Sequence, residues 1–210
     1  EQQANELVCL RQSITAAESD NPFYRCFEGG MLTLNAFIRK VPDRVVYWGT
    51  SGQRITDSYH FDACCMKELL DYSRLLHGKD IRGQLTPPSF EDIKTNIQFH
   101  YDAIRKYASS TGRSIYSFGW LLDIARCIYT LRTGKIISKT AAGEWALQNC
   151  LFHNITALET ALEVRKNPQK YLESAELQAL SGKLGNAIQQ YADVLEKELK
   201  TTSFVGVCTF

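Results

Sequence analysis

Residues 121–147 read LLDIARCIYTLRTGKIISKTAAGEWAL, and this stretch is the most informative part of the 210-residue chain. Its apolar positions recur at helical spacing, and a glycine, Gly134, interrupts the pattern. We therefore predict one helix near residues 114–132 and a second near 139–150, joined by a turn at Gly134. Helices with apolar stripes of this kind are typical of a helical bundle more than of a ligand site.

The helical pattern continues on both sides of this stretch. Further helices are predicted near residues 90–109, 153–166 and 170–200. The last of them carries a stripe whose members follow one another at steps of three and four residues, as expected for a helix with one buried face. The stripe consists of Leu177, Leu180, Leu184, Ile188, Tyr191 and Leu195.

A domain boundary is predicted at Thr86-Pro87-Pro88-Ser89. Ser89 is a good helix N-cap, and acidic residues follow it in the first turn of the next helix. Residues 86–210 are therefore predicted to form a C-terminal helical bundle domain, and residues 1–85 a separate α/β region.

The first 85 residues mix helical and strand patterns. Helices are predicted over residues 3–18 and 61–76, with strands over 27–39 and 45–48 between them. Two strands are too few for a stable sheet, so a partner is expected to complete it, and the obvious candidate is chain lying upstream. The predicted fold class is α+β, mostly α, with an incomplete α/β unit followed by a helical bundle.

Composition excludes several classes of protein. The 24 basic and 23 acidic side chains give a formal net charge of +1, which argues against affinity that comes mainly from nucleic-acid phosphates or anionic lipid. No apolar run is long enough for a membrane span, and the start at Glu1 lacks the features of a secretory signal. We expect no nucleic-acid partner, no membrane partner and a cytoplasmic location.

The seven cysteines do not form a disulfide or zinc pattern. Their number is odd and no Cys-x-x-Cys occurs, so they are expected to be reduced and to act as small apolar residues.

Residues 121–147 resemble the helical domain of aminoglycoside adenylyltransferases of the streptomycin/spectinomycin type. The matching positions are in register without a gap, and they are Arg126, Tyr129, Thr133, Gly134, Lys135, Lys139 and Trp145. The resemblance implies that residues 1–85 are part of a nucleotidyltransferase domain. It also implies transfer of AMP from Mg·ATP to a hydroxyl of an aminoglycoside-like molecule, with ATP and Mg as cofactors and with the nucleotide and the small-molecule acceptor as partners.

One feature of that family is absent from this sequence. Its nucleotidyltransferases hold Mg²⁺ with an Asp-x-Asp pair on a strand, and the 210 residues contain no such pair. No residue here is therefore assigned to the metal, and we expect the metal-binding segment to lie upstream and this chain to be inactive alone. Two alternatives are a non-catalytic binding module and one subunit of an assembly, formed as a homo-oligomer or by pairing with the missing segment through an open sheet edge near residues 30–48.

Three residues are candidates for chemistry and nucleotide binding. Glu28 comes just before the strand residues Met31 to Leu34, where the resemblance implies a third carboxylate, which would act as general base; the alternative is a surface glutamate. Lys139 begins a predicted helix, where free backbone N–H groups suit a triphosphate, and the resemblance implies the same role. Lys135 is a second nucleotide candidate, and for both lysines the alternative is a solvated side chain.

Three further residues are candidates for acceptor binding. Trp48 can pack on a sugar ring or an ammonium group, or it can be an ordinary core residue. Tyr116 lies where the family holds its cationic drug, but its neighbours here are basic rather than acidic. Glu144 lies on a short helix and can face either way. The acceptor therefore need not be streptomycin.

Overall fold

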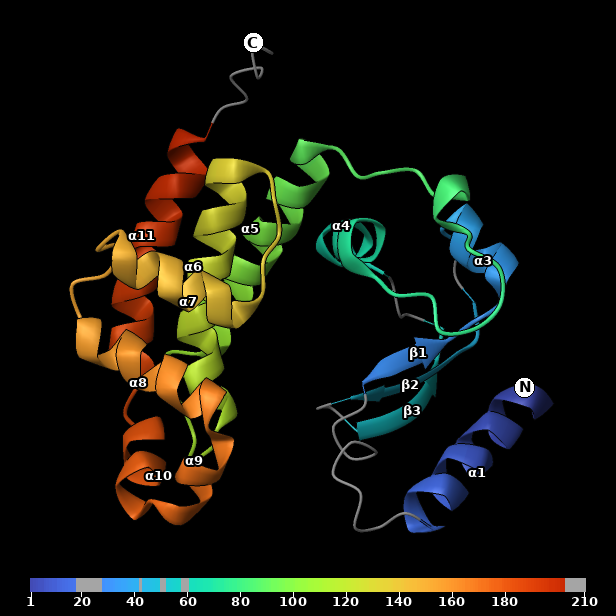
Figure 1. Cartoon of the computed structure of the whole chain (residues 1–210), viewed down its shortest axis with the longest axis horizontal. Helices are drawn as coiled ribbons and strands as arrows, with labels where there is room; N and C mark the ends of the chain where they lie inside the picture. The colour runs from blue at the N-terminus through green and yellow to red at the C-terminus, as the bar shows by residue number, and fades with distance from the viewer. Residues whose placement is uncertain (18–27, 42, 50–51, 58–60, 203–210) are drawn as a thin grey trace. The chain divides into compact units, whose positions relative to one another are not determined.

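The computed structural model divides the chain into two compact units (Figure 1). Unit 1 comprises residues 1–62 and 74–86, and unit 2 comprises residues 63–73 and 87–210. Residues 63–73 thus group with the second unit, although they precede the predicted boundary. The described residues are 1–17, 28–41, 43–49, 52–57 and 61–202.

Unit 1 contains a three-stranded antiparallel sheet in the order β1-β2-β3. The strands are β1 (Gly29–Met31), β2 (Val45–Gly49) and β3 (Gly52–Thr56). The central strand pairs with both neighbours, so that Val46 faces Met31 on one side and Ile55 on the other. Strand β3 is not apparent from the sequence, because it is short, has a single large apolar residue and is defined by its pairing with β2.

Residue 27 of the strand predicted over 27–39 lies outside the described residues, and residues 28–39 do not form a single strand. Only β1 joins the sheet, and a helix follows it, α3 (Leu34–Arg39). The N-cap Thr33 accepts a hydrogen bond from the Ala36 N–H at 3.4 Å, and Lys40 ends the helix with a left-handed φ of 55°. These two caps favour a helix over a strand, whatever the apolar pattern between them.

Helix α1 (Gln2–Ala17) packs on the sheet of unit 1, and its Ala4 forms a small buried cluster with Val46 and Trp48, which lie on one face of β2. A short 3₁₀ turn, η1 (Arg82–Gln84), ends the unit.

Unit 2 is helical, and α6 is its central element. Helix α6 contacts four others, α5, α7, α8 and α11, and most of its residues are buried. The α+β, mostly α prediction for the chain is confirmed. The helices are α4 (Ala63–Tyr72), α5 (Phe90–Tyr107), α6 (Tyr116–Thr133), α7 (Lys139–Gln148), α8 (Ile155–Lys166), α9 (Pro168–Glu173), α10 (Ala175–Ser181) and α11 (Gly185–Thr201).

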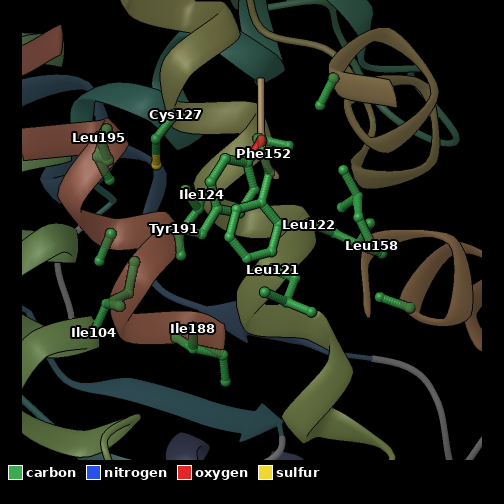
Figure 2. Packing of buried hydrophobic residues seen from close by; sticks show 14 of the residues in the cluster. Ile104, Leu121, Leu122, Ile124, Cys127, Phe152, Leu158, Ile188, Tyr191 and Leu195 are labelled. Atoms are coloured by element: carbon green, nitrogen blue, oxygen red, sulfur yellow. The ribbon is translucent and has the colours of Figure 1, made fainter. Parts of the chain in front are cut away.

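The core of unit 2 is closely packed (Figure 2). The rings of Phe152 and of Tyr191, a residue of α11, stack with their centroids 4.4 Å apart, beside Leu122 and Ile124 of α6. A side chain at Gly143 would meet Leu122 of α6 at 2.7 Å, so this glycine lets α7 approach α6 closely. Close approach of α7 to α6 matters for the site described below.

The long helix predicted over residues 170–200 is three helices, α9, α10 and α11. Ser174 separates the first two, because its backbone is extended and its side chain accepts a hydrogen bond from the Leu177 N–H at 3.2 Å. A second break at residues 182–184 precedes α11. The apolar stripe spans both α10 and α11, which explains why its spacing did not reveal the second break.

No helix of the described residues is long and apolar enough to span a membrane. No disulfide joins the cysteines at 9, 64, 65, 127 and 150, and Cys26 and Cys208 lie outside the described residues; the reduced state stays a prediction.

Candidate functional site

A buried carboxylate, Asp123, lies within the otherwise mostly apolar stretch of α6. Its side chain is only 9% exposed, and its neighbours along the helix, Leu122 and Ile124, belong to the core. A carboxylate in such a place is costly unless charged or hydrogen-bonded partners compensate for its lost hydration. The structure provides them.

Two cations share this carboxylate. Lys139 Nζ donates to Asp123 Oδ2 at 2.8 Å, and the Arg126 guanidinium donates to Oδ1 at 3.2 Å. The side chains of Lys139 and Arg126 are 28% and 30% exposed, so a solute reaches the cations more readily than the carboxylate. The group has one more positive than negative charge, which suits an anionic ligand.

Local turns bring Lys139 back to Asp123. Helix α6 ends at Gly134, whose left-handed φ of 67° and N–H bond to the Thr130 carbonyl close the last turn. Ser138 then caps α7 and accepts a hydrogen bond from the Ala141 N–H at 3.1 Å. Lys139 is therefore the first residue of α7.

A histidine from a third helix lies beside the same carboxylate. His100 Nε2 of α5 is 4.0 Å from Asp123 Oδ2, and the His100 ring lies 6.0 Å from the ring of Trp120. A protonated His100 would add a third positive charge to the group. We call Asp123, Lys139, Arg126 and His100 the Asp123 cluster.

Several hydrogen-bond donors of the Asp123 cluster have no acceptor within the described part of the chain. Lys139 uses one of its three N–H donors and Arg126 one of its five in bonds within the described part of the chain. The backbone N–H groups of Lys139 and Thr140, at the start of α7, also have no partner among the described residues. Ammonium, guanidinium and helix N-terminal donors together are the groups that bind phosphate.

The other candidates of unit 2 lie apart from these contacts. Lys135 is exposed, and its side chain makes no ion pair within the described residues. Glu144, with 45% of its side chain exposed, pairs with Lys166 of α8 at 2.6 Å. Tyr116 is 67% exposed at the start of α6. Their roles stay predictions.

The two candidates of unit 1 have different surroundings. Glu28 is exposed and directly precedes β1, as the sequence predicted. Trp48 is 3% exposed, and Arg11 of α1 lies over its ring at 5.4 Å. This burial favours the core role that was the alternative for Trp48; its role in acceptor binding stays a prediction.

Sequence reasoning missed two members of the Asp123 cluster. Asp123 had a signal, since a carboxylate in the run Leu121–Ala125 needs a partner, and Arg126 follows one helical turn later. His100 had no local signal, because α5 brings it to the cluster from a distant part of the sequence.

A buried thiol lies near the cluster. Burial raises the pKa of Cys127 above the ordinary value, and the negative charge of Asp123 acts in the same direction. Cys127 is therefore a protonated core residue rather than a nucleophile.

No group of three or more histidine, cysteine, aspartate or glutamate side chains among the described residues could hold a metal ion. The predicted role of Mg thus has no ligand set in this part of the chain.

Comparison with known proteins supports the assignment made from residues 121–147. A family model described as the aminoglycoside adenylyltransferase C-terminal domain matches residues 93–197, which include the whole Asp123 cluster. No curated protein and no solved structure matches the chain. The chain belongs to the aminoglycoside adenylyltransferase family, whose C-terminal domain it contains.

Proposed function

We propose that this chain binds the polyphosphate of ATP at the Asp123 cluster, as part of an adenylyltransferase that transfers AMP to a hydroxyl of an aminoglycoside-like acceptor. The observation that carries the proposal is the Lys139–Arg126 pair, two partly exposed cations held by one buried carboxylate within the region that matches the family.

Charge and geometry both favour a polyphosphate over a neutral ligand. Lys139 supplies an ammonium group and Arg126 a planar guanidinium with several unused donors, which together can contact more than one phosphate oxygen. The start of α7 adds backbone N–H groups and the positive end of a helix dipole. Lys135 is exposed four residues before Lys139, and its part in nucleotide binding also belongs to the proposal.

The proposal assigns no residue of this chain to magnesium. The 210 residues contain no Asp-x-Asp pair, and no ligand set is found in the described part. The role of Glu28 as general base also belongs to the proposal, and it is supported by the exposure of this carboxylate beside β1.

The acceptor is proposed to be a small molecule with hydroxyl and amino groups. Tyr116 and Glu144 are both accessible, and a half-exposed carboxylate such as Glu144 can exchange Lys166 for a ligand ammonium at little cost. The family name supports an aminoglycoside-like acceptor, and Tyr116 supplies an aromatic face for a sugar ring.

The nucleotide role is tested with Lys139→Ala in the 210-residue chain. Binding of ATP is followed by NMR through the backbone N–H signals of residues 139–141. A charge-assisted hydrogen bond contributes about 1.5–3 kcal/mol, so we expect affinity to fall at least about tenfold. The control is Lys170→Ala, which removes a lysine of α9 paired with Glu163 and should leave ATP affinity unchanged. Equal losses in both variants, or no binding by the unaltered chain, would contradict the proposal.

A second candidate function is a nucleotide-binding module without catalysis, which is compatible with the lack of an Asp-x-Asp pair in these 210 residues. The two candidates differ in one measurement on the native gene product that contains this chain, release of pyrophosphate from ATP with Mg and an aminoglycoside present. Release above the level of a Glu28→Gln variant supports the enzyme, whereas ATP binding without release supports the module.

A further inference from the structure

The Asp123 carboxylate contacts both phosphate-binding candidates, one through each oxygen. We propose that Asp123 is a positioning residue, which holds Lys139 and Arg126 as a fixed pair of cations before a polyphosphate arrives. This inference rests on the proposed function, because it assigns to Asp123 a role in that same site.

A structural need alone does not explain three charged groups at this place. Lys139 is the first residue of α7, where the helix dipole and unpaired N–H groups disfavour a cation. Asp123 compensates for that cation, but at the cost of placing a carboxylate in the core beside Leu122 and Ile124. An apolar pair at positions 123 and 139 would avoid both costs. The arrangement is useful where two cations must stand ready for an anion.

The contacts leave both cations available. Each uses a single N–H donor on Asp123, and each stays about three times as exposed as the carboxylate. A phosphate can therefore bind the unused donors without displacing Asp123. The carboxylate acts from behind the cations and does not touch the ligand, so it is not a catalytic residue.

Two opposing effects decide whether loss of the Asp123 carboxylate weakens or strengthens phosphate binding. Ordering a long side chain at a binding site costs roughly twofold to tenfold in affinity, and Asp123 orders two of them in advance. Its negative charge also repels the phosphate, by roughly threefold for unit charges about 6 Å apart in a water-like medium. Positioning is the larger effect, so loss of the carboxylate is expected to weaken binding.

The test is the Asp123→Asn variant of the 210-residue chain, titrated with inorganic tripolyphosphate and with ATP at pH 8. Asparagine has the size of aspartate but lacks the charge, so the fold should be retained, which circular dichroism checks. We expect affinity for both probes to fall about tenfold. The matched control is Glu163→Gln, which removes the charge of a carboxylate paired with a lysine, Lys170, at an exposed position of α8.

A double-mutant cycle separates positioning from a general structural role. If Asp123 acts through Lys139, the effect of Asp123→Asn should shrink below about threefold in a Lys139→Ala background. Unchanged or tighter binding by Asp123→Asn would show that the carboxylate competes with phosphate, and it would overturn the proposal. An equal loss in both backgrounds would overturn it too, because the carboxylate would then act on the fold. If the unaltered chain binds neither probe, the proposed function itself fails.

Discussion

Two clusters of charged side chains in unit 2 combine cations and carboxylates in opposite proportions. The Asp123 cluster joins one carboxylate to two cations that retain unused donors. A second cluster, which we call the Arg105 cluster, joins one cation to two carboxylates. It comprises Arg105 of α5, Tyr101 of the same helix, and Gln189, Asp193 and Glu196 of α11.

The donors of Arg105 are engaged within the protein. Its Nε donates to the Tyr101 hydroxyl, one terminal nitrogen donates to Gln189, and the other lies 2.5 Å from Asp193 and 3.3 Å from Glu196. Burial opposes the charge, but hydrogen bonds to Asp193 and Tyr101 raise the pKa of Arg105. Unused donors, rather than the number of ion pairs, therefore distinguish a candidate ligand site from a contact that joins two helices.

The Arg105→Ala substitution should have the largest effect on stability. It removes the bonds from α5 to α11 and leaves Asp193 and Glu196 without their shared cation. We expect the free energy of unfolding to fall by about 2 kcal/mol, measured by urea unfolding. Tripolyphosphate affinity should change less than about twofold, and a loss comparable to that of Lys139→Ala would break the distinction between the clusters.

Acid should weaken the Arg105 cluster. A hydrogen bond from Lys200, then one from Tyr101, and in smaller part the charge of Arg105 hold the pKa of Glu196 below its ordinary 4.5. A carboxyl whose folded pKa is lowered contributes stability above the unfolded value and loses it as pH falls through the folded value. The Glu196→Gln variant should therefore lose less stability than the unaltered chain between pH 5 and pH 3, measured by urea unfolding at each pH. Parallel curves for the two proteins would mean that Glu196 adds no pH dependence.

The contrast between the two clusters also explains what the sequence could predict. Local signals predict where α6 ends and α7 begins. Gly134 marks the end of α6, and Lys139 was correctly placed at the start of the next helix. Its contact with Asp123 depends on how α7 folds back over α6, which Gly143 permits through close packing. Such packing brings together residues sixteen positions apart, and no sequence motif marks a contact of this kind.

Unit 1 also contains a residue, Trp48, whose surroundings could not be predicted from the neighbouring sequence. Trp48 was correctly expected at the end of a strand, and both a core role and a ligand role were open. The choice depends on α1, which covers one face of β2 with residues more than thirty positions away. Likewise, the caps at Thr33 and Lys40 decided for a helix where the apolar pattern favoured a strand.

The smallest change in stability is expected for Lys139→Ala, the substitution with a large expected effect on ATP binding. The lost pair with Asp123 is partly offset, because a cation leaves the first turn of α7, where the helix dipole disfavours it. Arg126 also stays beside Asp123 and continues to compensate for the buried carboxylate. We therefore expect a change of less than about 1 kcal/mol in the free energy of unfolding. If Lys139→Ala instead destabilised the chain as much as Arg105→Ala, the Asp123 cluster would be a structural contact like the Arg105 cluster. Its unused donors would then carry no functional meaning.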